Sequence, residues 1–173
     1  DYHKAIEYGE RLFKIGYEKQ DYKFGILYAH IGLGQAYIML GDSTAINHLG
    51  QAKLLAESEK NDSALCSIYN GMGLYASNIH RDYYSALHYF FEGIEATHRC
   101  QYQELEAILL GNISSIYYLK DDPTGLTYSL QIYELGHQLN SAYLIFIGAL
   151  NASYMYYLLH EYDKALPYIQ EAE

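Results

Sequence analysis

Apolar residues recur along this chain with the spacing of one face of an α-helix, and the same helical pattern returns five times. Each copy has a small residue, a branched aliphatic residue one position later, and Tyr or His three positions later. Side chains three and seven positions apart lie on one side of a helix. The small residues that mark the five copies are Ala5, Ala45, Ala86, Gly125 and Ala165, at intervals of 40, 41, 39 and 40 residues. The sequence therefore predicts five equivalent helices in a regular repeat.

A second helix is predicted before each of the last four copies. These four stretches also carry apolar residues at helical spacing, and they read LYAHIGLGQAYIML, CSIYNGMGLYASNI, ILLGNISSIYYLK and GALNASYMYYLLH. Turn residues separate them from the following helix at 41–43, 80–82 and 121–123, and more weakly at 160–161. Asp, Ser and Thr at these points suit a helix N-terminus, because their side-chain oxygens accept hydrogen bonds from free backbone N–H groups.

Together these helices predict an all-α fold, a right-handed α-solenoid of four antiparallel helix hairpins after one leading helix. The expected boundaries are a helix at 1–19 and repeats at 20–60, 61–100, 101–139 and 140–173, all in one array. Each repeat of such an array contacts only its neighbours. Because the chain starts and stops inside the pattern, we expect it to be a piece of a longer protein. Its cut ends are then surfaces for self-association.

Short side chains at the predicted helix crossings have a mechanical purpose. Two helices approach to about 8–10 Å only where the side chains between them are small. Gly34, Gly73 and Ser114 on the first helices are expected to face the small residues of the second helices. The chain has 22 tyrosines and no tryptophan. We expect these tyrosines to fill the wedges between successive hairpins.

The repeat resembles the tetratricopeptide repeat family over essentially the whole chain. Two segments are similar to that family's first-helix motif and two to its second-helix motif, Asp-Tyr-x-x-Ala-Leu. They are Gly32–Gly34 with Tyr37, Met72–Gly73 with Tyr75, Asp82–Leu87, and Tyr162–Leu166. The family's period is about 34 residues, so this chain departs from it, as it does in lacking the motif's tryptophan. It is similar in style to the long-period arrays of bacterial signalling proteins and transcriptional regulators.

Composition excludes several classes of function. The formal net charge is −10, which disfavours nucleic-acid binding because the phosphate backbone selects clustered Lys and Arg. A charged partner is expected to be basic. No apolar run approaches the roughly 20 residues that a membrane-spanning helix needs. The compartment stays open between cytoplasm and periplasm.

Residues for catalysis or metal binding are not arranged in any recognised pattern. None of the eight histidines lies three or four positions from another, so no helix presents an adjacent ligand pair. No nucleophile motif occurs. Cys66 and Cys100 fall at neighbouring ends of one predicted hairpin, so a disulfide is conceivable, although two free, largely buried thiols are the default. We expect no enzyme, no metal and no cofactor.

Asparagine recurs in the predicted first helices, at Asn70, Asn112 and Asn151. Asn is a poor residue inside a helix, so a contact should compensate for it. In the family that the chain resembles, first helices line a concave groove, and asparagines there hold the backbone of a bound extended peptide. The resemblance implies that role here. The alternatives are a structural hydrogen bond between repeats and a solvated residue on the groove floor.

Other side chains on the same helix face would complete a peptide- or protein-binding groove. They include Gln35, Asn78, Ser115, Tyr118, Tyr154 and Tyr157. The face is poor in Lys, which disfavours capture of an acidic C-terminal peptide. We therefore expect a non-enzymatic protein–protein interaction module, the sensing or regulatory region of a larger bacterial signal-transduction protein or transcriptional regulator. A constitutive scaffold for a multiprotein complex is the alternative.

Overall fold

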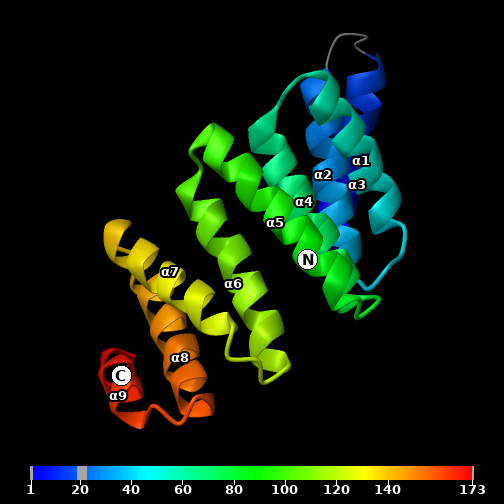
Figure 1. Ribbon diagram of the computed structural model, residues 1–173. Coiled ribbons are helices and arrows are strands. Elements are labelled where there is room, and N and C mark those ends of the chain that lie inside the picture. Colours follow the sequence, from blue (N-terminus) through cyan, green and yellow to red (C-terminus); the bar gives the residue numbers. More distant parts are fainter. Residues whose placement is uncertain (1, 19–22, 173) are drawn as a thin grey trace. The chain divides into compact units, whose positions relative to one another are not determined.

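A computed structural model describes residues 2–18 and 23–172 of the chain. Within those ranges the chain is entirely helical, with nine helices joined by short turns and no strand (Figure 1). The helices are α1 (Tyr2–Glu18), α2 (Lys23–Met39), α3 (Ala45–Ser58), α4 (Asp62–Asn78), α5 (Tyr83–Cys100), α6 (Gln103–Leu119), α7 (Gly125–Gln138), α8 (Ala142–Leu158) and α9 (Tyr162–Glu171). The all-α prediction is confirmed. The predicted boundaries at 1, 19, 20 and 173 lie outside the described residues.

The chain forms two compact units, residues 1–100 with α1–α5 and residues 101–173 with α6–α9. The division coincides with a predicted repeat boundary. Within each unit every helix packs on its neighbour in sequence, as expected of a helical-repeat solenoid. One array over the whole chain, and its right-handed curvature, stay predictions.

The first helices of successive repeats form an inner layer in each unit. Cα atoms of α2 lie within 8 Å of those of α4, and the same holds for α6 and α8. Between the second helices, α1, α3 and α5 in one unit and α7 and α9 in the other, no such approach occurs over the described residues. Closer spacing on one side bends a stack toward that side. The inner layer is therefore the side where the sequence predicts a groove.

Helices α2 to α8 are each followed by a turn residue in the left-handed backbone conformation. Seven turn residues have positive φ angles: Gly41, Lys60, Arg81, Gln101, Asp121, Asn140 and His160. After Lys60, the N–H of Asn61 donates to the carbonyl of Ala56 at 2.9 Å, which closes the helix end. The predicted capping also occurs, since Asp42 accepts from the backbone N–H of Thr44 at 2.8 Å and Asp82 from that of Ser85 at 3.1 Å.

The crossings inside the hairpins are as tight as the small residues predict. A Cβ atom on Gly34 would lie 2.7 Å from Leu49 Cγ, and one on Gly73 would lie 2.3 Å from Phe90 Cε1. Ser114 and Ser129 meet at the equivalent point in the third hairpin, with their hydroxyl oxygens 2.9 Å apart. Gly34, Gly73 and Ser114 therefore lie at close crossings, but they face the residues four positions after the repeat's small residues rather than the small residues themselves. The repeat's small residues are buried, with one exception, Ala5 on α1.

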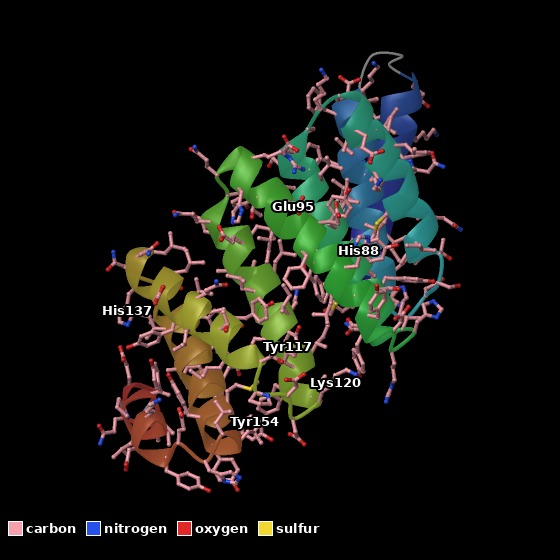
Figure 2. All side chains as sticks on the ribbon, viewed as in Figure 1. His88, Glu95, Tyr117, Lys120, His137 and Tyr154 are labelled. Carbon is pink, nitrogen blue, oxygen red and sulfur yellow. The ribbon has the colours of Figure 1, made fainter. Side chains whose placement is uncertain are left out.

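Aromatic rings stack across three of the four hairpins. Tyr37 lies on His48, Tyr117 on Tyr128 (Tyr117 is labelled in Figure 2), and Tyr156 on Tyr168. The ring centroids are 5.5, 5.5 and 5.6 Å apart. These rings fill space inside a hairpin, so the prediction that tyrosines fill wedges between hairpins is wrong for them. Tyr133 with Tyr168, at 5.2 Å between α7 and α9, does lie between hairpins.

A pair of histidines interrupts the apolar packing of the first unit. His30 on α2 is buried, its ring meets Phe13 edge-on, and its Nδ1 lies 3.0 Å from Nδ1 of His48 on α3. One ring must donate and the other accept. Burial, and then the charge of a protonated His48, lowers the pKa of His30 to about 4. Burial also lowers the pKa of His48, against an opposing effect from Glu10.

We expect acid to destabilise the first unit through His30. A pKa of about 4 in the folded chain lies below the usual value of 6.5, so between these values the unfolded chain binds more protons and folding weakens as the pH falls. The loss from pH 7 to pH 5 should be on the order of 1–2 kcal/mol. It is measured by urea unfolding at both pH values. His30→Leu introduces the residue type that α6 has at the equivalent position, and it should make the free energy of unfolding depend less on pH. The control is His88→Gln on the exposed face of α5, which should leave that pH dependence unchanged (His88, Figure 2).

The glycines of the second unit allow a matched test of close packing. A Cβ atom on Gly148 of α8 would lie 2.5 Å from the backbone nitrogen of Tyr133, whereas one on Gly111 of α6 would meet nothing within 4 Å. Gly148→Ala should lower the free energy of unfolding by about 2–3 kcal/mol, because backbone cannot move aside. Gly111→Ala should raise it by about 0.5–1 kcal/mol through helix propensity. Equal effects of the two substitutions on urea unfolding would contradict the packing described here.

Candidate functional site

The inner layer of the first unit contains a hollow of about 470 Å³. It lies over α2, with α1 on one side and α4 on the other. Two of the predicted groove residues, Gln35 and Asn70, line it together with apolar neighbours such as Ile38, Met39 and Leu74. Amide groups at the edge of an apolar hollow are suited to hold a peptide backbone, because each amide both donates and accepts hydrogen bonds.

A second hollow, of about 330 Å³, lies on the inner layer of the second unit. Four of the predicted groove residues line it: Tyr118, Asn151, Tyr154 and Tyr157. They come from α6 and α8, and the remaining lining is Leu150, Ser153 and Ile169. Six of the nine groove residues that the sequence predicts therefore line one of these two hollows.

The remaining three predicted residues line neither hollow. Asn78 is exposed at the end of α4, where its side-chain oxygen accepts a hydrogen bond from Ser77 Oγ at 3.0 Å. Ser115 is also exposed, and its hydroxyl donates to the carbonyl of Gly111 at 2.8 Å within its own helix. Asn112 is half-buried on α6. None of the three lines either of the two hollows, and their part in a common groove stays a prediction.

The three asparagines do not occupy one repeat position. Asn112 and Asn151 are each the tenth residue of their helix, whereas Asn70 is the ninth and Gly71 takes the tenth place in α4. One residue turns a side chain by about 100° around a helix. Asn70 therefore points in a different direction from the other two relative to its own helix. The asparagines are 42 and 39 residues apart, which is close to the repeat interval, so their spacing in the sequence does not show this one-residue shift.

Asn151 makes the structural hydrogen bond between repeats that was the alternative to a peptide clamp. Its Nδ2 donates to Ser114 Oγ on α6 at 3.2 Å. Ser114 also meets Ser129 of α7, whose hydroxyl donates to the carbonyl of Gly125 at 2.9 Å. The chain of hydrogen bonds ties α8 to the crossing of α6 and α7. Asn151 thus stabilises the unit and lines the hollow at once.

Four tyrosine rings form a continuous row beside the second hollow. We call Tyr118, Tyr154, Tyr157 and Tyr162 the tyrosine row; successive ring centroids are 4.4, 6.3 and 5.9 Å apart. Tyr154 (Figure 2) donates its hydroxyl proton to Asp121 Oδ1 at 2.6 Å. That hydrogen bond is the main reason that the pKa of Tyr154 rises to about 12.

Sequence reasoning missed Asp121 and Tyr162 at this place. Asp121 follows the end of α6 and was interpreted only as a turn and helix cap, and Tyr162 begins α9. Both reach the row through the folding of turns that the repeat pattern does not describe. The available signal was their position, because each immediately borders a turn at the same end of its unit.

The histidine, cysteine and acidic side chains are the candidates for metal binding and nucleophilic catalysis. Over residues 2–18 and 23–172, no group of three His, Cys, Asp or Glu side chains could hold a metal ion. The two cysteine Sγ atoms are 3.6 Å apart and unbonded. Cys66 donates its thiol proton to the carbonyl of Asp62 at 3.0 Å, and burial raises the pKa of Cys66 to about 12. Such a thiol is a poor nucleophile near neutral pH.

No helix among the described residues is long and apolar enough to cross a membrane. In comparisons with known proteins, no protein-family model and no curated protein matches this sequence. The geometry of the two hollows and the tyrosine row therefore carries the functional argument.

Asn151→Ala should lower the free energy of unfolding by about 1 kcal/mol, the usual value of a hydrogen bond between partly buried groups. Urea unfolding measures the change. Ser115→Ala, on the exposed side of α6, is the control and should stay within about 0.5 kcal/mol of the native chain. If Asn151→Ala unfolds like the control, the hydrogen bond to Ser114 does not stabilise the unit.

Proposed function

We propose that this chain is a protein–protein interaction module that binds a segment of a partner along its inner helix layer. The observation that carries the proposal is a hollow on that layer in each unit, lined by apolar, aromatic and amide side chains. Amphipathic linings of this kind suit a polypeptide, which offers both backbone polar groups and side chains. The chain's tetratricopeptide-like motifs support the same function.

Exposed aromatic and aliphatic side chains on the inner-layer helices support this assignment. Beside the hollows they include Phe24, Tyr28, Ile108, Tyr143, Phe146 and Leu150. Single exposed apolar residues are normal on a protein surface, but several on the inner layer of one unit mark an interaction surface. The packing of the units does not need these side chains, because the small residues and stacked rings already fill the hairpins.

The role we propose for this binding is regulatory, within a larger bacterial signalling protein or transcriptional regulator. Binding along the inner layer would change how successive helix pairs pack, and a solenoid transmits such a change through its nearest-neighbour contacts. We expect the chain not to bind nucleic acid, since its net charge of −10 opposes phosphate contacts.

Site-specific photo-crosslinking tests the location of binding. A photoreactive phenylalanine analogue replaces Tyr28 of α2 or Tyr157 of α8, both on the inner layer, and the chain is expressed in its source cells. Crosslinked partners should appear from these two positions and be identified by mass spectrometry. Controls at Leu54 of α3 and Tyr84 of α5, which are more exposed than Tyr28 and Tyr157 but lie on second helices, should give none. Crosslinking mainly from Leu54 and Tyr84 would overturn the proposal.

A further inference from the structure

The tyrosine row presents ring surfaces to solvent at one end of the second unit. Tyr118, Tyr157 and Tyr162 are 42%, 58% and 55% exposed, although each ring touches another ring of the row. Aromatic rings with free faces attract cations, because the face of the ring carries the negative part of its quadrupole. The row therefore offers several adjacent faces to one positively charged group.

Charges around the row are predominantly negative. The second unit contains two lysines, no arginine and nine Asp and Glu residues, a formal charge of −7. Lys164 is held by Glu161 at 2.9 Å, and Lys120 has a partner of its own. Asp121 is exposed and reaches the row through its hydrogen bond to Tyr154. A cation arriving at the row therefore meets a carboxylate.

Helix ends at this place add to the same preference. Tyr118 lies in the last turn of α6 and Tyr157 in the last turn of α8. The C-terminal end of a helix carries a partial negative charge from its free carbonyl groups and favours cations. The N-terminus of α9 has the opposite sign, but Glu161 and Asp163 lie at it.

We propose that the tyrosine row and Asp121 bind an arginine side chain of the partner segment. This proposal rests on the proposed function and names the chemistry of one contact. A guanidinium group is planar, stacks on aromatic faces and donates hydrogen bonds to a carboxylate, which matches the ring faces of the tyrosine row and the Asp121 carboxylate bonded to Tyr154. The adjacent hollow of about 330 Å³ accepts the neighbouring part of the partner's chain. An acidic segment would be repelled.

NMR titration with short peptides tests this contact directly. The probe is acetyl-Gly-Gly-Arg-Gly-Gly-amide, and its matched control replaces Arg with citrulline, which has the same shape and no charge. The arginine peptide should shift the amide signals of Tyr118, Asp121, Tyr157 and Tyr162. The citrulline peptide should bind at least about five-fold more weakly, since a cation–π contact contributes about 1 kcal/mol at an exposed site. Equal binding of the two peptides, or shifts elsewhere only, would overturn the proposal.

Variants distinguish the loss of the Tyr157 ring from a general loss of folding. Tyr157→Leu should weaken the arginine peptide at least about five-fold, whereas Tyr157→Phe, which keeps the ring face, should bind like the native chain. Asp121→Asn should weaken binding and reduce its dependence on salt. If a variant melts early, the arginine–citrulline comparison on the native chain still decides. Crosslinking at Tyr28 is independent of the row, so the contact can fail while the proposed function stands.

Discussion

Close approach of the two helices in each hairpin is the constraint on which the rest of this structure depends. At Gly73 of α4 the ring of Phe90 on α5 occupies the space of a side chain, and between the third and fourth hairpins the backbone of α7 does so at Gly148 of α8. Because Gly34 and Gly73 have no side chain, Leu49 and Phe90 of the partner helices pack directly against them. In the third hairpin, rings three positions beyond Ser114 and Gly125 stack across it, as Tyr117 does on Tyr128. Contacts with the second helices thus complete the core of each unit. The face of each first helix that points away from the second helices remains exposed on the inner layer.

This division explains why the inner layer can expose apolar groups without endangering the fold. Phe24 and Tyr28 on α2 are 59% and 50% exposed, whereas Leu27 and Leu33 of the same helix are almost fully buried. Packing and the proposed binding thus use different faces of one helix. The two faces are not wholly independent, because Asn151 lines a hollow while it donates to Ser114 in the crossing below.

Repeat periodicity made the helices and their crossings predictable, since a small residue every 40 residues or so fixes both the helix face and its partner. The same reasoning found Gln35 and Tyr157 at the hollows. It placed Asn70 at a hollow too, but not at the same helix position as Asn112 and Asn151, because a similar interval along the chain does not guarantee the same place around a helix. Asp121 and Tyr162 were beyond its reach, because turn geometry, and not helical period, brings them to the tyrosine row.

At Tyr154 a structural contact orders the surface that we propose binds arginine. Its hydroxyl is held by Asp121, and its ring lies 4.4 Å from Tyr118 and 6.3 Å from Tyr157, so the hydrogen bond fixes the ring between its two neighbours. A preorganised row loses less side-chain entropy on binding than four independent tyrosines would. The carboxylate that orders the rings is also the charge that a guanidinium group would meet. One hydrogen bond therefore positions both elements of the proposed contact.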